Sequence, residues 1–276
     1  MSLSIRTNVA SIDAQNNLSQ TQDALTLTMD QLSSGDRITS AAVDAAGLGI
    51  STNLEAQISS YAQAGRNAND GVSLAQTAAG SLTQVANILT SLRNLAMEAA
   101  SDGVGTAGRS DITTEAGQLG AELDRINATA EYNGNNFFAN AGPQTFQVGI
   151  RGTANDVITV DTTGMDVSST GLGVDGLLFD SNTDAQASIT AIDTALTNVQ
   201  GFQATLGAAS NRLESAVNTI QAESQNLSAA DSRIRDVDVA SATSELSRQQ
   251  VLSQAGIAVL AQANNTPQEA LKLLNG

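Results

Sequence analysis

The sequence contains neither histidine nor cysteine, which removes thiolate chemistry, histidine metal ligands and the commonest general base, but an enzyme could still work with carboxylates. Four aspartates follow one another in the middle of the chain, at Asp156, Asp161, Asp166 and Asp175. Their spacing matches no calcium-binding loop with a fixed turn and a terminal bidentate ligand. A hydrolase with two carboxylates would need them gathered in a pocket, and no motif gathers them. We therefore expect no catalytic residue, no metal site and no cofactor.

The charge of the chain argues against two classes of partner. Acidic residues outnumber basic ones by 28 to 12, and the formal net charge is −16. This charge opposes binding to nucleic acids and to anionic membrane surfaces. No apolar run approaches the length of a membrane span, so we expect neither nucleic-acid binding nor membrane insertion. The first residues, MSLSIRTNVASIDAQNN, lack the pattern of an ordinary secretory signal, and composition alone would indicate a cytoplasmic protein.

The apolar residues are of a kind that suits long helices packed side by side. They make up 41% of the chain, yet aromatic residues make up only 3%. Burial must therefore come from Ala, Leu, Ile and Val. The only prolines are Pro143 and Pro267, so almost nothing interrupts a helix in either half.

The N-terminal half reads as three helices. The first carries apolar residues at heptad-like spacing and ends at residues 33–35, at Ser-Ser-Gly. A loop over residues 36–49 precedes the longest helix of this half, whose stripe extends from residue 54 to residue 92. A shorter helix spans residues 111–128, with Asp111 as its N-cap.

The middle of the chain reads as β-structure. Asn133-Gly134 marks a tight turn, and apolar and polar residues alternate over 146–150 and again over 157–161. The β-hairpin region is predicted at about 132–161. Residues 162–183 are rich in Gly, Ser, Thr and Asp and are expected to form an exposed connection.

The strongest periodic pattern lies in the C-terminal half. From residue 189 to residue 234, fourteen positions step alternately by three and four, and ten of them are Ile, Leu or Val. This predicts a helix over 187–235, about 75 Å long at 1.5 Å per residue. A last helix over 241–263 is followed by Thr-Pro-Gln-Glu, which predicts a kink or a restarted helix near Asn265.

These patterns predict a mainly α fold: a long helical hairpin or coiled-coil bundle with a small β-hairpin region in the middle of the chain. Neither terminal helix can bury its apolar stripe alone. The terminal segments are rich in small residues and poor in charge, which favours association with other copies of the chain. An intramolecular bundle is the alternative.

Both ends of the chain contain motifs that resemble those of the bacterial flagellins. The N-terminal motifs are Leu-Ser-Ser-Gly at 32–35, Asp-Ala-Ala-Gly at 44–47 and Arg-Asn-Ala-Asn-Asp-Gly-Val-Ser at 66–73. The C-terminal motifs include Arg-Ile-Arg-Asp at 233–236 and Val-Leu-Ala-Gln-Ala-Asn at 259–264. The resemblance covers roughly residues 1–160 and 185–276.

The resemblance implies a structural subunit that assembles into the bacterial flagellar filament for swimming motility. It also implies secretion through the flagellar type III export apparatus, a flagellin chaperone, a filament cap and an extracellular location. Residues 1–44 with 236–276 would form an inner polymerisation domain, and residues 45–235 an outer rod-shaped domain with a short variable connection at about 162–185. The chain resembles the short form of the family, without large outer domains.

Three sets of residues follow from the helical patterns and the resemblance. The self-assembly set is Leu18, Leu25, Met29, Leu32, Leu246, Leu252, Val259 and Leu260. The positions matching those read by the vertebrate Toll-like receptor for flagella are Leu89, Arg93, Leu95 and Glu122, but Ser91 and Asn94 replace an Arg and a Glu, which predicts weakened recognition. The candidate O-glycosylation sites are Ser168, Ser169 and Thr170.

Two other functions remain as alternatives. A hook–filament junction protein of the flagellum shares weaker versions of the terminal helices but differs in the motifs above. The cytoplasmic signalling rod of a chemoreceptor also has Ala-, Ser- and Gln-rich heptads. Such a rod should lack the β-hairpin predicted within residues 132–161.

Overall fold

The structure is a computed structural model that describes residues 7–139 and 142–275, with side chains through Thr266. The chain forms two compact units. The terminal unit comprises Met1–Ala56 and Asn226–Gly276, and the central unit comprises Gln57–Gln225. The predicted inner and outer domains have different limits from these units, and they stay a prediction.

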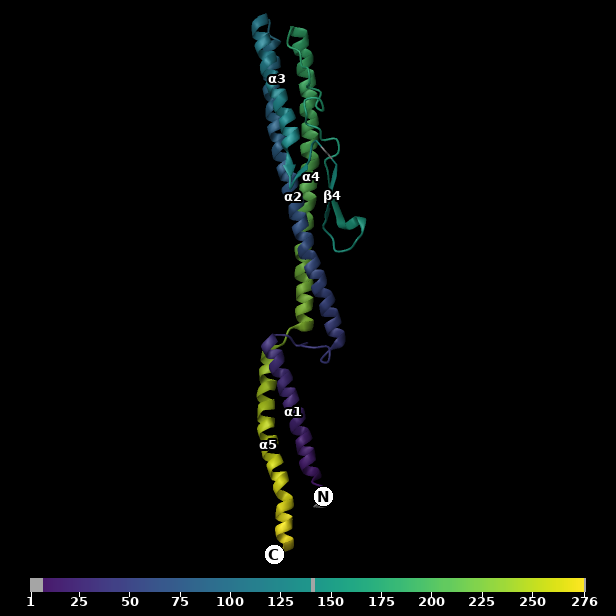
Figure 1. The fold of residues 1–276 in the computed structure, drawn as a ribbon, viewed down its shortest axis with the longest axis vertical. Coiled ribbons are helices and arrows are strands. Elements are labelled where there is room, and N and C mark those ends of the chain that lie inside the picture. The colour runs from purple at the N-terminus through teal and green to yellow at the C-terminus, as the bar shows by residue number, and fades with distance from the viewer. Residues whose placement is uncertain (1–6, 140–141, 276) are drawn as a thin grey trace. The chain divides into compact units, whose positions relative to one another are not determined.

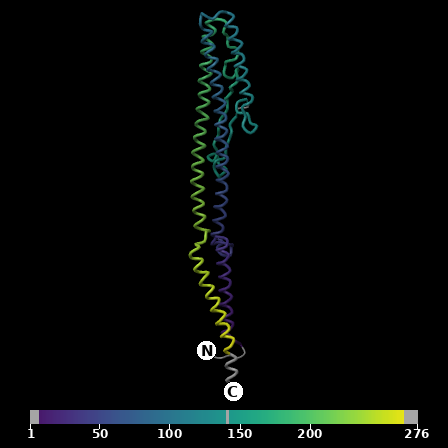
Figure 2. Tube along the Cα trace, turned by 90° about the vertical axis from the view of Figure 1, so that its left-hand side faces the viewer, coloured from purple at the N-terminus to yellow at the C-terminus, as the bar shows by residue number. Residues whose placement is uncertain are grey.

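Two antiparallel helices lie side by side in the terminal unit, α1 (Val9–Ser34) and α5 (Val239–Asn275), as Figures 1 and 2 show. Helix α1 has defined caps at both ends. The Asn8 side chain accepts a hydrogen bond from the backbone N–H of Ser11 (3.1 Å), and Gly35 ends the helix in the left-handed region at φ 81°. The predicted end of the first helix is therefore confirmed.

Helix α2 (Ala45–Ala99) begins earlier than the sequence analysis predicted. The Asp44 carboxylate accepts a hydrogen bond from the backbone N–H of Gly47 (2.8 Å), as a helix N-cap does. The loop expected over residues 36–49 therefore ends at residue 44. The sequence analysis treated Asp44 as part of a family motif and overlooked its capping role.

Helices α2 and α4 (Asn182–Arg235) supply most of the core of the central unit, and α3 lies alongside α2 (Figure 1). The large buried aliphatic residues of α4 recur every seventh residue, as the heptad pattern predicts. They are Ile192, Val199, Leu206, Leu213 and Ile220. The buried residues of α2 include Leu82, Val85, Leu89 and Leu92. The predicted apolar stripes are thus the contact faces of the bundle.

Helix α3 (Thr106–Thr129) begins before Asp111, so the predicted N-cap is wrong. The N-cap position belongs to Gly105, and Asp111 lies within the helix. Arg109 lies in the first turn, and its guanidinium donates to the backbone oxygens of Ala99 (3.0 Å) and Ser101 (3.4 Å). Arg109 thereby connects the first turn of α3 to the last carbonyl of α2 and to the turn that follows α2.

The β-structure consists of two small antiparallel pairs. Strands β1 (Glu131–Tyr132) and β2 (Asn135–Asn136) flank the predicted Asn-Gly turn, whose residues both have positive φ. Strands β3 (Pro143–Gln147) and β4 (Val157–Asp161) form the predicted hairpin, with a short 3-10 helix at Ala154–Asp156 before β4. Strand β3 lies a few residues before the expected 146–150.

The segment after the hairpin is not the exposed connection that its composition predicted. Five of its apolar side chains are buried in the core of the central unit, although Leu178 is exposed. The buried apolar residues are Met165, Val167, Leu172, Val174 and Phe179. The buried hydroxyl of Thr162 donates to the backbone oxygen of Gly142 (2.8 Å). The Gly, Ser and Asp content of this segment correctly indicated a loop. It gave no sign that apolar residues of the same loop cover the bundle.

Helix α5 continues through residue 265, so the predicted restart is wrong, and the predicted kink stays a prediction. The Thr266 hydroxyl donates to the backbone oxygen of Gln262 (2.9 Å), as a residue inside a helix does. Pro267 has no N–H for the oxygen of Ala263, four residues earlier. The side-chain amide of Asn8 donates to that oxygen instead (2.8 Å). A contact from α1 therefore satisfies the carbonyl that proline leaves free.

Candidate assembly interface

The face of α1 that meets α5 is a narrow stripe with as many small or polar residues as large ones. Its buried and half-buried members step alternately by three and four. They are Ser11, Ala14, Leu18, Thr21, Leu25, Thr28 and Leu32. The matching stripe of α5 is Ala242, Leu246, Gln249, Ser253, Gly256, Leu260 and Ala263. The spacing is that of a coiled-coil seam, but few of its members are large aliphatic residues.

Polar bonds and one close approach connect the two stripes. The Ser11 hydroxyl donates to the amide oxygen of Asn264 (2.8 Å), and the buried Thr28 hydroxyl donates to that of Gln249 (3.2 Å). A Cβ atom added at Gly256 would lie 3.2 Å from a terminal methyl carbon of Leu18, so glycine allows the helices to approach. The polar bonds and the close approach therefore make the pairing of α1 with α5 specific.

The terminal unit exposes most of the large apolar side chains that the described residues leave open to solvent. Eleven of thirteen belong to it: Val9, Ile12, Leu27, Met29, Val43, Ile50, Val239, Val251, Leu252, Ile257 and Val259. Only Met97 and Leu178 belong to the central unit, although that unit holds more residues. Such a concentration is typical of a surface that a partner covers.

The structure divides the predicted self-assembly set into two groups. Five members lie half-buried in the stripes between α1 and α5: Leu18, Leu25, Leu32, Leu246 and Leu260. Three point to solvent, with Met29 and Leu252 each 52% exposed and Val259 58% exposed. The first group holds the helix pair together. Only the second group is free to contact another copy.

A charged cluster joins the loop after α1 to the end of α4. Arg235 forms ion pairs with Asp36 (3.1 Å) and Glu55, and its hydrogen bond to the Asp36 carboxylate raises the pKa of Arg235 above its usual value. The Arg37 side chain donates to the backbone oxygen of Ile234 (2.6 Å). Arg235 belongs to the Arg-Ile-Arg-Asp motif, and Arg37 follows the Leu-Ser-Ser-Gly motif. Their position between helix ends was the available sign of a structural role.

The predicted receptor positions are largely engaged within the central unit. Leu89 is fully buried, and Leu95 is half-buried. Arg93 pairs with Asp193 (2.6 Å), and the hydrogen bond that its guanidinium donates to that carboxylate raises the pKa of Arg93. Glu122 pairs with Arg125 (2.6 Å). A receptor would therefore have to compete with two internal ion pairs.

Polar residues after the hairpin serve local structure. Ser169 is buried, and its hydroxyl donates to Asp124 (3.1 Å), which leaves it poorly placed for a sugar. Ser168 is half-buried and Thr170 is exposed, so these two remain candidates. Asp156 caps the 3-10 helix, and the backbone N–H of Thr163 donates to Asp161.

The described residues contain neither a metal-binding cluster nor a helix that could span a membrane. No group of three or more acidic side chains there is placed to hold a metal ion. No helix in the same residues is long and apolar enough to cross a membrane.

Comparison with known proteins shows the family. The model of the bacterial flagellin N-terminal helical region matches residues 5–142, and that of the C-terminal helical region matches residues 189–274. A flagellin of Halalkalibacterium halodurans is 40% identical over 258 residues, which cover 94% of this chain and 93% of that protein. The chain belongs to the bacterial flagellin family. It is therefore a structural subunit of the flagellar filament, as its motifs predicted.

Further relatives agree in length and name. A flagellin of Bacillus subtilis is 36% identical over 307 residues, covering 98% of this chain and 99% of that protein. The flagellar filament 30.7 kDa core protein of Treponema maltophilum is 35% identical over 285 residues, covering 98% of this chain and 99% of that protein. The chain is thus a short-form flagellin, because relatives of nearly its own length align from end to end.

Proposed function

We propose that the paired helices α1 and α5 form the polymerising surface of this filament subunit, and that the central unit forms its outer part. The proposal rests on one observation: the exposed large apolar side chains gather on the terminal unit. At about 25 cal/mol per Å² of apolar surface buried, covering them favours assembly. In a homo-oligomer, an exposed apolar surface of one subunit is buried against another copy of the same subunit.

The experiment compares two matched double substitutions in seeded filament growth. Leu252→Ser with Val259→Ser removes two exposed apolar side chains from the terminal unit, and Met97→Ser with Leu178→Ser removes two from the central unit. The first variant should fail to elongate short filament seeds in added salt. The second should elongate them nearly as the wild-type protein does. Equal loss in both variants would contradict the proposal, and wild-type protein that stayed monomeric would contradict assembly itself.

We further infer that the subunit is secreted, that its location is extracellular, and that it serves swimming motility without catalysis. Membership of the flagellin family supports export through the flagellar type III apparatus with a chaperone and a filament cap. The net charge of −16 would keep unassembled subunits apart until salt screens it. Fractionation of cells with and without a working export gate tests this. The protein should leave the cell only in the first.

Recognition by the vertebrate Toll-like receptor for flagella should be weak. Ser91 and Asn94 cannot supply the charge-assisted contacts of an Arg and a Glu. The internal pairing of Arg93 with Asp193 adds a competing interaction (2.6 Å). Ser91→Arg with Asn94→Glu should raise potency in a receptor reporter assay. Unchanged potency in that variant would count against this explanation.

A further inference from the structure

Helix α5 carries a second seam beside the stripe that α1 covers. Arg248, Leu252, Ala255 and Val259 follow one another at steps of four, three and four, so they share one helix face. All four are exposed in the subunit. The stripe that meets α1 is offset from this seam and is buried or half-buried. One helix therefore has two parallel seams, and the subunit fills only one of them.

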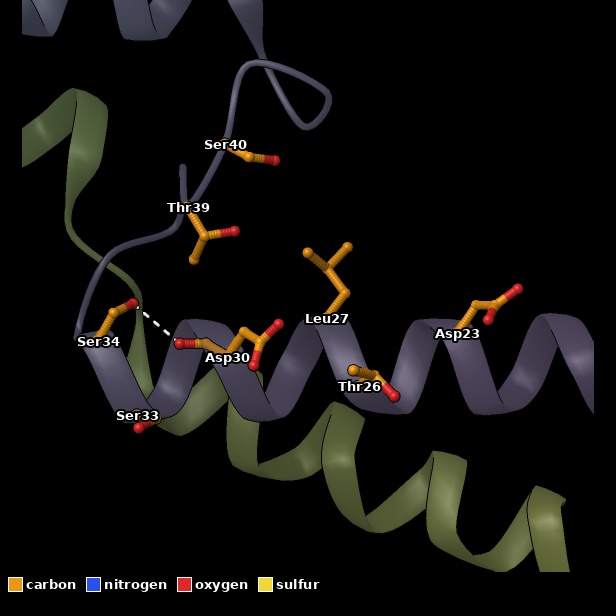
Figure 3. Close-up of a pocket in the computed structure, with 8 residues that line it drawn as sticks. All are labelled: Asp23, Thr26, Leu27, Asp30, Ser33, Ser34, Thr39 and Ser40. Atoms are coloured by element: carbon orange, nitrogen blue, oxygen red, sulfur yellow. Dashed lines mark hydrogen bonds between the residues drawn. The ribbon is translucent and has the colours of Figure 1, made fainter.

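Helix α1 presents a complementary groove on its face away from α5. Figure 3 shows Asp23, Leu27 and Asp30 on this face, below Thr39 and Ser40 of the following loop, with α5 beneath the opposite side of α1. The groove has a volume of about 590 Å³. Its apolar member is Leu27, which is 37% exposed. The subunit's own α5 cannot fill this groove, because α1 lies between them.

We propose that this groove receives the second seam of α5 from another copy of the chain, with Leu252 seated against Leu27 and Arg248 beside Asp30. The proposal rests on the polymerising surface proposed above and names its contacts. The two helices would lie antiparallel, as they do within one subunit. Both helices rise about 1.5 Å per residue. In an antiparallel pair with Leu252 opposite Leu27, the residue four positions before Leu252 therefore lies opposite the residues about one helical turn after Leu27. That places Arg248 close to Asp30.

Charge complementarity identifies the occupant as a second copy. Helix α1 contains three aspartates and no basic residue, and in the described part of the chain neither Asp23 nor Asp30 has a cationic partner. Arg248 is the basic residue beside the exposed seam, with its side chain 67% exposed and paired only to Glu245 on its own helix. The exposed seam of α5 combines apolar side chains with one arginine, and the groove of α1 combines one leucine with two aspartates. The two surfaces are therefore complementary in charge and in apolar character.

The two surfaces differ, so the contact is heterologous and can propagate. Each copy offers a groove on α1 and a seam on α5, and a copy whose seam is engaged still has a free groove. A head-to-tail contact of this kind generates rings or open helical filaments rather than closed dimers. The geometry therefore suits growth of a filament from subunits of one type.

Cross-linking of mixed single-cysteine variants tests the contact, because the natural chain has no cysteine. Leu27→Cys protein and Leu252→Cys protein are mixed, grown from short filament seeds and oxidised. The expected product is a covalent dimer between the two variants, since disulfides require Cβ atoms about 3.5–4.5 Å apart. Met29→Cys replaces Leu27→Cys as the control, because Met29 is exposed on a different face of α1. Filaments that cross-link through Met29 and not through Leu27 would overturn the proposed contact while leaving filament assembly intact.

A charge exchange tests the ion pair independently. Asp30→Arg and Arg248→Asp should each raise the critical concentration for seeded growth roughly tenfold, because each places like charges together. The double variant should return to within roughly threefold of wild type. Asp13→Arg makes the same charge change elsewhere on α1 and should have little effect. Equal loss in the double variant, with helical content unchanged by circular dichroism, would refute the pairing.

Discussion

Gly71 lies in the interior of α2, where glycine is a poor helix former, and its contacts explain its presence. A Cβ atom there would lie 3.0 Å from a methyl carbon of Leu213 and 3.0 Å from the ring of Phe146. Gly80 lies in the same helix with nothing within 4 Å of an added Cβ. The two glycines therefore provide a matched pair, and substitution by alanine should have opposite effects on the free energy of unfolding of the central unit.

The magnitudes follow from propensity and packing. Alanine is about 0.8–1.0 kcal/mol more favourable than glycine in a helix interior, so Gly80→Ala should stabilise the unit by nearly that amount. Gly71→Ala gains the same propensity. It also forces a methyl group against Phe146 and the fully buried Leu213, and overpacking of this kind costs about 1–3 kcal/mol. The expected net effect is a destabilisation of about 1 kcal/mol.

Thermal unfolding of the unassembled subunit, followed by circular dichroism, measures the difference. A change of 1 kcal/mol shifts Tm by about 2–4 °C for a domain of 150–250 residues, and the central unit spans Gln57–Gln225. Gly80→Ala should melt about 2–4 °C above the wild-type protein and Gly71→Ala about as far below it. If both variants melted above wild type by the same amount, the close approach of α2, α4 and β3 at Gly71 would be refuted.

Three further predictions concern other contacts. The hydrogen bond from Arg125 lowers the pKa of Glu122 below 4.5, so its contribution to stability is complete above that pH and is lost as the pH falls through the folded-state value. An NMR titration should show the low pKa, and Arg125→Gln should return it to its usual range. Leu206→Ala should cost about 2–5 kcal/mol in the free energy of unfolding, measured with denaturant, because Leu206 is buried in the bundle. Asn8→Asp keeps the side-chain oxygen that caps α1 but removes the N–H donor to the Ala263 carbonyl, which Pro267 leaves without a helical partner. The substitution should weaken seeded growth of the otherwise natural chain, and weaken it less when Pro267→Ala is also present. Equal effects with and without Pro267→Ala would contradict the assigned bond.

The elements that could be predicted are those whose signals are local and repeated. The heptad pattern of α4 specified the buried residues from Ile192 to Ile220, because a periodic stripe and a partner helix impose the same spacing. The Asn133-Gly134 turn was predictable because few residues other than asparagine and glycine adopt positive φ there. Neither inference needed knowledge of distant contacts.

The missed features depend on partners far away in the sequence. Arg109, in the first turn of α3, is bonded to the end of α2. Asp111 has a side chain suited to an N-cap, but it lies inside the helix that Arg109 helps to position. The continuity of α5 depends on Asn8, which lies 255 residues from Ala263. The segment containing Val167 and Phe179 is buried because the bundle offers a surface to cover. Local composition carries none of this information.

The predicted self-assembly residues stay a prediction, and the structure divides them between two faces of the helices. Helical spacing identified apolar positions on α1 and α5 but could not say which stripe each helix uses within the subunit. Leu18 and Leu260 lie in the stripe between α1 and α5. Leu252 and Val259 lie in the exposed seam of α5, and each is next in sequence to a residue of the covered stripe. The distinction requires the partner helix to be in place. A single sequence periodicity therefore describes two interfaces at once.

The composition of the two seams indicates how folding and assembly are kept separate. The stripe between α1 and α5 uses polar bonds such as Thr28 to Gln249, and these specify the pairing. Leu252 and Val259 are exposed on the other seam, which we propose that a neighbouring copy covers. The central unit has its own buried core and does not depend on that neighbour. Substitutions in the exposed seam of α5 should therefore abolish filaments and leave the central unit folded. Substitutions in the stripe between α1 and α5 should first change the register in which these two helices pair.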